Sequence, residues 1–336
     1  MFEVVSIHDH IRWQKILDLF HVSDIYYTSQ YFLSAMKLDP GESLMFYYID
    51  EEGEIAYPFI KRKIEGHSIA YYDITTPFGY GGPLVKISRD VSRLISNFIH
   101  VFSEYCQQEN IIVEYIRFHP LKGNAELFEN HLKLLPVHET FTLQLDPYTE
   151  NLELKNKNEL KERWENGFTI KKLGTVKHMF EFLVLYYSGA RRKEDADSYY
   201  FFTNDYFEAL ISSLGPNLHL FGAYHNDKLI SACYVLAMGD TIYHHLEGSS
   251  EETETEDSMK MLLLKIAEWG QDNYFGSFHL GGDYRKGEDS GLGIKEEISN
   301  MNPAVFYICK KVHDASIYKQ LISEEESDVI KRYRNI

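Results

Sequence analysis

The run Phe278-His279-Leu280-Gly281-Gly282-Asp283 combines residue types that can hold and react with a substrate at the end of a strand. Glycines let a substrate approach the backbone and leave its N–H groups available as hydrogen-bond donors. His279 or Asp283 could accept a proton, and Arg285 could bind a carboxylate or phosphate through its two-pronged guanidinium. A glycine turn followed by an ordinary surface loop is the alternative interpretation.

Further candidates for the same chemistry lie in the first half of the chain. His119 follows an apolar strand, so it is either a general base near neutral pH or a hydrogen-bonded, half-buried imidazole, and the same choice applies to His279. The aromatic loop at 71–84 would suit a sugar or peptide acceptor, unless it is purely structural. The candidate binding residues are Tyr72, Asp73, Tyr80, Gly81, Gly82, Arg117, Tyr243, His244, Gly281, Gly282 and Arg285.

Metal and thiol chemistry are not expected. His244 and His245 are adjacent, so on a regular strand only one of them can face a cleft, and neither has a Cys or carboxylate partner at metal-ligand spacing. The three cysteines are odd in number and widely spaced in apolar sequence, which indicates reduced core thiols. Without a nucleophile motif, direct attack by an amine on an acyl donor is favoured.

Composition indicates a folded protein with two cores. The chain has 336 residues, of which 44% are hydrophobic and 15% aromatic, whereas single domains usually have roughly 100–200 residues. No apolar run reaches the ~18 residues of a membrane helix, and the N-terminal sequence lacks a secretory pattern, so we expect no membrane span and a cytoplasmic location.

The charge balance bears on nucleic-acid partners. A net charge of −17 opposes non-specific binding to a polyanion. One group of basic residues has two alternative interpretations, a local basic patch or simply a solvated helix face: Lys155, Lys157, Lys161, Arg163, Lys171, Lys172 and Lys177.

Hydrophobic periodicity predicts an α/β order in the first half. Apolar residues recur at i, i+3 and i+4 over 88–110, which predicts an amphipathic helix that feeds the strand 111–118. Helices at 9–21 and 28–37 and a β-hairpin over 44–64 come before it. The Pro and Gly density of 71–84 predicts an irregular loop.

The second half repeats this order. Asn226-Asp227 and Gly239-Asp240 join three strands into a meander, and Asp257 or Ser258 is expected to cap the helix that follows. The expected helices are 153–167, 176–190, 205–213 and 257–273, the expected strands are 218–226, 228–238, 241–250, 275–282 and 304–312, and a helical tail follows at 314–334.

Four segments in this order resemble the FemABX-like family of tandem GNAT-fold proteins: YYDITTPFGYGGPL, IRFHPLKGN, YHHLEGSS with its helix, and FHLGGDYRKGEDSGLGIKEEIS. The family's R-F-x-P element resembles Arg117 to Pro120, its L-G-G turn resembles Leu280 to Gly282, and its Phe-Lys pair resembles Ile294-Lys295, where the aromatic is replaced. The chain looks like the compact members that lack a coiled-coil arm. The best-known members transfer an amino acid from aminoacyl-tRNA to a peptidoglycan precursor.

The resemblance implies an α/β (α+β) fold of two tandem GNAT-like (acyl-CoA N-acyltransferase fold) domains with a cleft between them. The N-terminal lobe would be 1–148, with a helix at 315–336 packing back on it, and the lobe 149–314 would carry the acyl-transfer site. The implied activity is transfer of an aminoacyl or acyl group onto an amino group of a cell-envelope precursor, either peptidoglycan or a surface polysaccharide. Lys295 would then stabilise negative charge on the donor ester or oxyanion.

The donor would be aminoacyl-tRNA or acyl-CoA as a co-substrate, with no tightly bound cofactor, and the acceptor a small molecule or glycopeptide. An acetyl-CoA-dependent GNAT enzyme holds pyrophosphate on a Gly-rich turn before the helix that follows the meander. Here that segment, EGSSEETETED, is acidic, which disfavours CoA and favours aminoacyl-tRNA or another activated acyl donor. The alternatives are an acyl-CoA-dependent N-acyltransferase acting on an amino sugar and a catalytically silent protein that binds a glycan or a partner. The oligomeric state stays open.

Overall fold

The computed structural model describes residues 1–66, 68–145, 167–191, 201–250, 255–282 and 292–321. The chain forms two compact units: unit 1 contains 1–22, 26–137 and 306 onward, and unit 2 contains 23–25 and 138–305. Within the described ranges, no helix is both long enough and apolar enough to cross a membrane.

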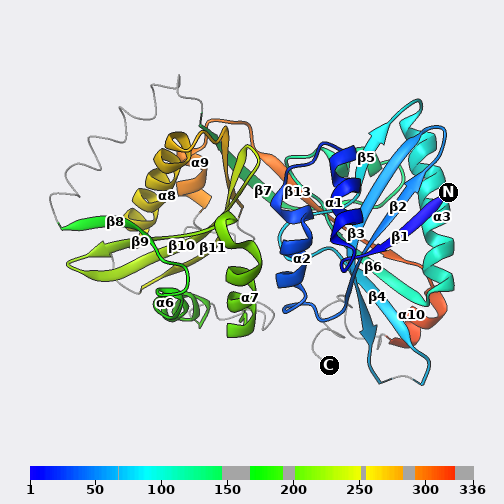
Figure 1. Ribbon diagram of the computed structural model, residues 1–336, viewed down its shortest axis with the longest axis horizontal. Helices are drawn as coiled ribbons and strands as arrows, with labels where there is room; N and C mark the ends of the chain where they lie inside the picture. The colour runs from blue at the N-terminus through cyan, green and yellow to red at the C-terminus, as the bar shows by residue number, and fades with distance from the viewer. Residues whose placement is uncertain (67, 146–166, 192–200, 251–254, 283–291, 322–336) are drawn as a thin grey trace. The chain divides into compact units, whose positions relative to one another are not determined.

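Unit 1 is built on a mixed sheet of strand order β1-β2-β3-β4-β6-β13, with β5 paired to β3 (Figure 1). Neighbouring strands are antiparallel except β4 and β6, which are parallel. The strands are β1 (Phe2–Ser6), β2 (Glu42–Ile49), β3 (Gly53–Ile64), β4 (Tyr71–Thr75), β5 (Leu84–Ile87), β6 (Ile111–Arg117) and β13 (Ala304–Val312).

An aromatic core lies between this sheet and helix α3 (Val91–Gln108). Asp90 caps α3 by accepting a hydrogen bond from Arg93 N at 3.1 Å, and the apolar face of the helix buries Phe98 and Phe102 against Phe46 and other residues of β2 and β3. The predicted amphipathic helix is therefore confirmed. The other helices of unit 1 are α1 (His10–Leu19), α2 (Ser29–Ala35), α4 (Asn124–Phe128) and α10 (Ala315–Leu321).

Unit 2 has a second sheet, of strand order β7-β12-β11-β10-β9-β8, in which only β11 and β12 are parallel. Helix α8 covers one face of the sheet and α6 the other (Figure 1). The strands are β7 (Leu135–Gln144), β8 (Phe168–Leu173), β9 (Leu218–His225), β10 (Lys228–Met238), β11 (Thr241–Ser249) and β12 (Ser277–Gly281), and the helices are α6 (Met179–Arg191), α7 (Asn204–Leu214), α8 (Thr255–Asp272) and α9 (Leu292–Ile298).

The two units repeat one order of elements. The order β1-α1-α2-β2-β3-β4-α3-β6 of unit 1 recurs in unit 2 as β8-α6-α7-β9-β10-β11-α8-β12. In both units the strand before the long helix pairs in parallel with the strand after it. The predicted repetition of an α/β order is thus present in the molecule.

The chain passes from unit 1 to unit 2 at 137–138 and returns at 305–306. The compact units therefore divide at places other than 148–149 and 314–315, because β13 pairs with β6 of unit 1 through Ile308 to Val312. Helix α10 follows β13 and contacts β6.

Two local expectations are wrong. Tyr71–Thr75 is strand β4 rather than loop, because every Gly and Pro of the 71–84 segment lies after Thr76. Helix α8 begins at Thr255, so Ser258 lies inside the helix rather than at its cap. The Oγ of Ser258 is 2.6 Å from Ser231 Oγ. The expected helix at 153–167 lies outside the described residues except for Gly167.

Candidate active site

Strands β11 and β12 pair through only three residues and then separate. Their parallel register joins Thr241–Tyr243 to Ser277–His279, although β11 continues to Ser249. Each strand has a bulge where they part: His245 is an extra residue of β11 opposite β10, and Leu280 is an extra residue of β12 opposite β7. Since a bulge bends a strand and re-aims its side chains, the gap between the two strands is a built feature of unit 2.

The bulge at His245 brings His244 and Glu247 together. On a regular strand, residues three apart point to opposite faces, and one extra residue between them restores a common face. His244 Nε2 lies 3.2 Å from Glu247 Oε2, and His244 Nδ1 donates to the Leu280 carbonyl at 3.2 Å. The imidazole thus spans the gap between β11 and β12.

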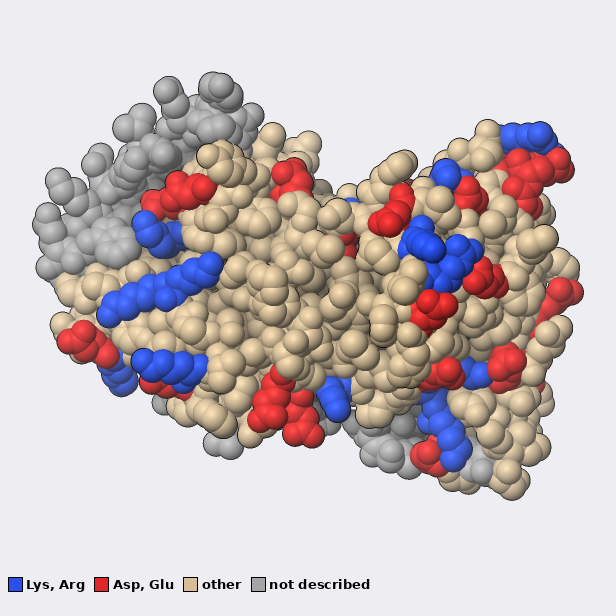
Figure 2. All heavy atoms as spheres, in the orientation of Figure 1, with Lys and Arg blue, Asp and Glu red and all other residues tan. Residues whose placement is uncertain are grey.

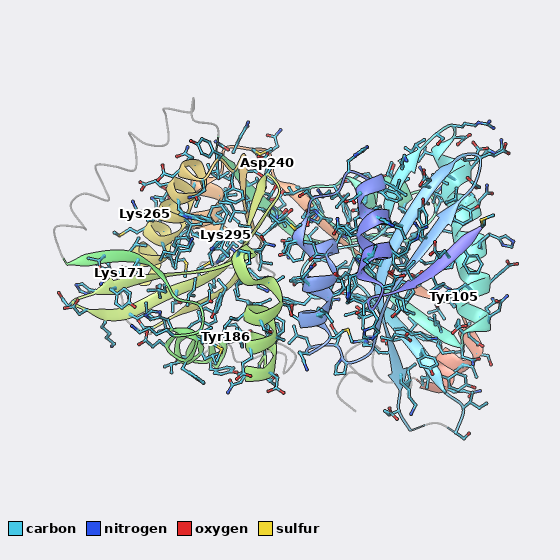
Figure 3. All side chains as sticks on the ribbon, viewed as in Figure 1. Tyr105, Lys171, Tyr186, Asp240, Lys265 and Lys295 are labelled. Atoms are coloured by element: carbon cyan, nitrogen blue, oxygen red, sulfur yellow. The ribbon has the colours of Figure 1, made fainter. Side chains whose placement is uncertain are left out.

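Lys295 reaches the same strand end from helix α9. The residue is only 7% exposed, and its ammonium donates to the Gly282 carbonyl at 3.1 Å, its one hydrogen bond within the described part of the chain. Figure 3 places Lys295 inside unit 2, in contrast to Lys171 and Lys265 nearer its outer side. A buried cation with spare N–H groups is suited to stabilising a developing negative charge.

The Cys233 thiol on β10 lies within electrostatic range of both Glu247 and Lys295. Burial and the Glu247 carboxylate raise the pKa of the Cys233 thiol well above its usual range, while the Lys295 ammonium opposes them. The thiol is therefore protonated at neutral pH and unsuited to nucleophilic attack.

His279 and Tyr243 lie beside this gap but are packed into the sheet. His279 is 1% exposed and its Nδ1 is 3.0 Å from Thr142 Oγ1. The hydroxyl of Tyr243 donates to the buried Asp24 carboxylate at 2.7 Å, and its ring packs edge-on against His279 at 5.8 Å. Both side chains therefore support the strand end from within the core.

Glycine is required at positions 281 and 282 of the strand end for two different structural reasons. Gly281 has a φ of 70°, a left-handed conformation that glycine adopts without strain. A Cβ on Gly282 would overlap His138 Nδ1 and the Glu139 carbonyl of β7. The adjacent candidates Asp283 and Arg285 lie outside the described residues.

A second group of candidates gathers in unit 1. The ring of Tyr80 lies 5.3 Å from that of His119, whose Nδ1 accepts from Leu121 N at 3.1 Å. Gly81 pairs with Phe118, the residue before His119, and the carbonyl of Gly81 accepts from Asn124 Nδ2 at 2.9 Å. These contacts bring Tyr80, Gly81 and His119 together.

The neighbouring Gly82 and Arg117 serve this packing. Gly82 has a φ of 86°, and a Cβ there would come within 3.1 Å of Phe118 Cδ1. Arg117 donates to Thr75 Oγ1 and to the Thr76 carbonyl, each at 3.0 Å. Its guanidinium is thus engaged in joining the ends of β4 and β6.

Tyr72 and Asp73 take part in a different set of contacts on β4. The buried Asp73 pairs with Arg62, which also binds Asp39 at 2.5 Å. Lys61 Nζ lies 4.3 Å from the centre of the Tyr72 ring. The sequence suggests Tyr72 and Asp73 as binding residues. In the fold, Asp73 belongs to a charged cluster and Tyr72 makes a cation–π contact.

Charge is interspersed on the surface. Figure 2 shows basic side chains among acidic ones on the face in view. Of the basic stretch, Lys171 stacks on Tyr224 at 4.9 Å and Lys172 on Trp269 at 4.5 Å, while Lys155, Lys157, Lys161 and Arg163 lie outside the described residues. No three His, Cys, Asp or Glu side chains of the described ranges form a metal-binding group.

Comparison with known proteins bears on the fold. Residues 161–289 match the family model of an acetyltransferase (GNAT) domain. Comparison with curated proteins gave no match.

Solved structures match over nearly the whole chain. FemX has a TM-score of 0.63 and 11% identity, over 96% of this chain and 99% of its own. L-PGS from Bacillus licheniformis has a TM-score of 0.55 and 13% identity, over 98% of both chains. A tandem GNAT protein from the clavulanic acid biosynthesis pathway has a TM-score of 0.53 and 10% identity, over 92% of this chain and 98% of its own. The predicted α/β tandem GNAT architecture is confirmed, and the chain has the fold of FemX.

Proposed function

We propose that the protein is a transferase that moves an aminoacyl or acyl group onto an amino group of a cell-envelope precursor, with the reaction at the gap between β11 and β12. The observation that carries the proposal is the buried ammonium of Lys295 at the Gly282 carbonyl, next to two strands that part at paired bulges. The GNAT acyltransferase fold of this unit and the likeness to FemX support it.

Lys295 is suited to the negative charge that forms on the acyl oxygen. Attack on an ester or thioester carbonyl creates an oxyanion, and a preorganised donor in a site of low water content stabilises it strongly. Lys295 has few competing partners in the described residues, so its remaining N–H groups can be directed at that oxygen.

Aminoacyl-tRNA is the proposed donor, and acyl-CoA the alternative. CoA-dependent relatives bind pyrophosphate at the start of the helix that corresponds to α8. Here the sequence from Glu247 to Asp257, which leads into α8 and includes its first residues, carries six carboxylates that would repel pyrophosphate. Three of the lysines of unit 2, Lys171, Lys172 and Lys177, offer positive charge for a nucleic acid.

A transfer assay tests the proposal. The protein is incubated with radiolabelled aminoacyl-tRNA or with acetyl-CoA, each together with a nucleotide-linked peptidoglycan precursor or an amino sugar, and amide formation is measured. Transfer from charged tRNA supports the proposed donor, and transfer only from acetyl-CoA replaces it with the alternative. Binding of a precursor without turnover of either donor would instead identify a catalytically silent binding protein.

A further inference from the structure

Two hydrogen-bond acceptors face each other at the bulge of β11. His244 Nδ1 must carry a proton, because its partner, the carbonyl of Leu280, can only accept. In the neutral ring Nε2 then bears a lone pair, and it lies 3.2 Å from a carboxylate oxygen of Glu247. Within the described residues Nε2 makes no hydrogen bond.

This arrangement calls for a donor. A lone pair and a carboxylate at 3.2 Å repel each other, and a buried polar atom without a hydrogen bond costs roughly 1–3 kcal/mol. A proton on Nε2 would turn the contact into an ion pair, and a bound N–H group would give Nε2 its missing hydrogen bond while lying next to the carboxylate. Only 5% of the His244 side chain is exposed, whereas 38% of the Glu247 side chain is exposed. An amine from solvent therefore meets the carboxylate first and Nε2 behind it.

The bulge of β11 and a hydrogen bond to β12 hold this pair in place. On a regular strand, with His245 paired instead of bulged, His244 and Glu247 would be three positions apart and would point to opposite faces of the sheet. The His244 ring is anchored to β12 by the bond to Leu280, so Nε2 cannot turn to another partner without losing that bond. A fixed lone pair next to a carboxylate is the arrangement that holds an amine and then accepts a proton from it.

We infer that His244 and Glu247 form a subsite for a primary amine, in which Glu247 attracts the amine and His244 Nε2 hydrogen-bonds its nitrogen and takes its proton. The amine is the nucleophile of the proposed transfer or the α-amino group of an aminoacyl donor, and in the first case the inference rests on the proposed function.

For the nucleophile, the step balances as follows. The neutral amine nitrogen forms a bond to the acyl carbon, and one N–H proton passes to Nε2. The resulting imidazolium is stabilised by Glu247 at 3.2 Å, while Lys295 stabilises the oxyanion. When the tetrahedral intermediate collapses, the carbon–oxygen or carbon–sulfur bond breaks and the leaving oxygen or sulfur takes the proton back from Nε2.

The charged and titratable groups around His244 come from several elements. Glu247 is on β11 itself, Cys233 is on β10 and Lys295 is on α9. The neighbouring His245 is held neutral, because burial and His244 lower its pKa to about 3. Among these groups, only His244 combines a lone pair within the site with a carboxylate beside it.

Nitrogen-15 NMR of ring-labelled histidine tests the subsite without any transfer reaction. Methylammonium chloride, a primary amine, is titrated into the whole protein, and tetramethylammonium chloride, which has no N–H group, is titrated at equal ionic strength. The Nε2 resonance of His244 should move saturably with methylammonium and not with tetramethylammonium. Glu247→Gln should weaken methylammonium binding at least ~10-fold, since a charge-assisted bond is lost.

A matched control is present on helix α3. His100 Nε2 and Glu104 Oε1 form an exposed pair at 3.5 Å. The His100 resonance should respond equally to the two salts, and Glu104→Gln should leave methylammonium binding at His244 unchanged. A His244 resonance that ignores methylammonium, or follows both salts alike, overturns the inference.

Transfer kinetics test the subsite and the proposed function independently. They also distinguish the two sources of the amine. His244→Asn keeps a donor for Leu280 and removes Nε2; it should lower kcat ~10²–10⁴-fold if the amine is the nucleophile. If the α-amino group is bound instead, the variant should mainly raise the KM of the aminoacyl donor. Methylammonium binding without any transfer would support the subsite and reject the transferase. Transfer that His244→Asn leaves at the wild-type rate and KM would reject the subsite alone.

Discussion

The ammonium of Lys295 and the carbonyl of Gly282 are 3.1 Å apart and join helix α9 to the end of strand β12. Among the described residues this nearly buried charge has one neutral acceptor, and burying an ion costs more stability than one such bond returns. A charged residue that is buried at such a cost in stability is a candidate for a catalytic role.

Replacing Lys295 should separate activity from stability. In Lys295→Met the charge is lost and the shape is largely kept, so kcat for the transfer should fall ~10²–10³-fold, the usual effect of removing an oxyanion donor. The melting temperature should stay equal or rise, because a buried charge is removed. Initial rates and thermal unfolding measure both effects. Lys265→Met, at a side chain that is 47% exposed, should alter neither, and full turnover by Lys295→Met would refute the assigned role.

Gly282 should tolerate no side chain. Gly282→Ala places a methyl group against His138 and the Glu139 carbonyl, so β7 or β12 must shift and the free energy of unfolding should fall by about 1–3 kcal/mol. Urea unfolding measures the change. Gly293→Ala in helix α9 is the control, because nothing lies within 4 Å of its added carbon. Equal effects of the two substitutions would contradict the packing described for β7.

Glu114 should make unit 1 sensitive to acid. Burial would raise the pKa of this carboxyl, but His313, whose Nε2 lies 3.4 Å from it, holds the pKa below its ordinary value with help from Lys311 and Tyr57. For an acid with a lowered pKa in the folded state, the stabilisation is complete above the unfolded pKa and is lost as pH falls through the folded pKa. Glu114→Gln should therefore lower the free energy of unfolding by about 3 kcal/mol at pH 7, the cost of breaking a buried pair.

The same difference should shrink when urea unfolding is repeated below about pH 4, where the unfolded carboxyl takes up its proton. Glu104→Gln, whose side chain is 58% exposed, should change the free energy of unfolding by less than about 0.5 kcal/mol at both pH values. A difference between wild type and Glu114→Gln that is independent of pH would argue against an ionised Glu114.

His245 should remain neutral between pH 5.5 and 8. Burial, together with His244, lowers its pKa to about 3, and its Nε2 lies 2.8 Å from the hydroxyl of Tyr206. Burial and Lys172 likewise lower the pKa of His219 to about 4. The ring resonances of both residues should stay constant between pH 5.5 and 8 in an NMR titration. Titration of His245 within this range would mean that β11 is open at the bulge.

Periodicity and turn chemistry were enough to predict much of the fold. The 3.6-residue repeat of α3 and the paired runs of β2 and β3 report directly which face is buried. Asn226 and Asp227 occupy the positive φ values of 48° and 64° that a two-residue hairpin requires, and their residue types favour that conformation. Strands β7 and β8 were missed. The partner of β7 is β12, which is 137 residues away between Thr142 and His279, so nothing local to β7 indicates the pairing.

The candidate site was predictable only in part, because register decides which side chains meet. Lys295 was identified through a motif, but its burial depends on how α9 packs. Glu247 counts in the sequence only as one of the acids before the helix, since on a regular strand it points away from His244, and the bulge that reverses this depends on hydrogen bonds of neighbouring strands. An acid three residues after a histidine, on either side of a possible bulge, is the signal that could have found it. For Arg117 and Asp73, residue type suggested binding, whereas the fold satisfies both internally.

The return of β13 to unit 1 has a consequence for synthesis on the ribosome. Strand β6 has been synthesised once residue 117 is translated. Its partner β13 begins only at residue 304, when almost all of unit 2 has been translated. Unit 1 cannot complete its sheet in the order in which it is made, and β6 waits with an open edge that can pair wrongly. We therefore expect the nascent chain to depend on a holding factor until its last strand is released.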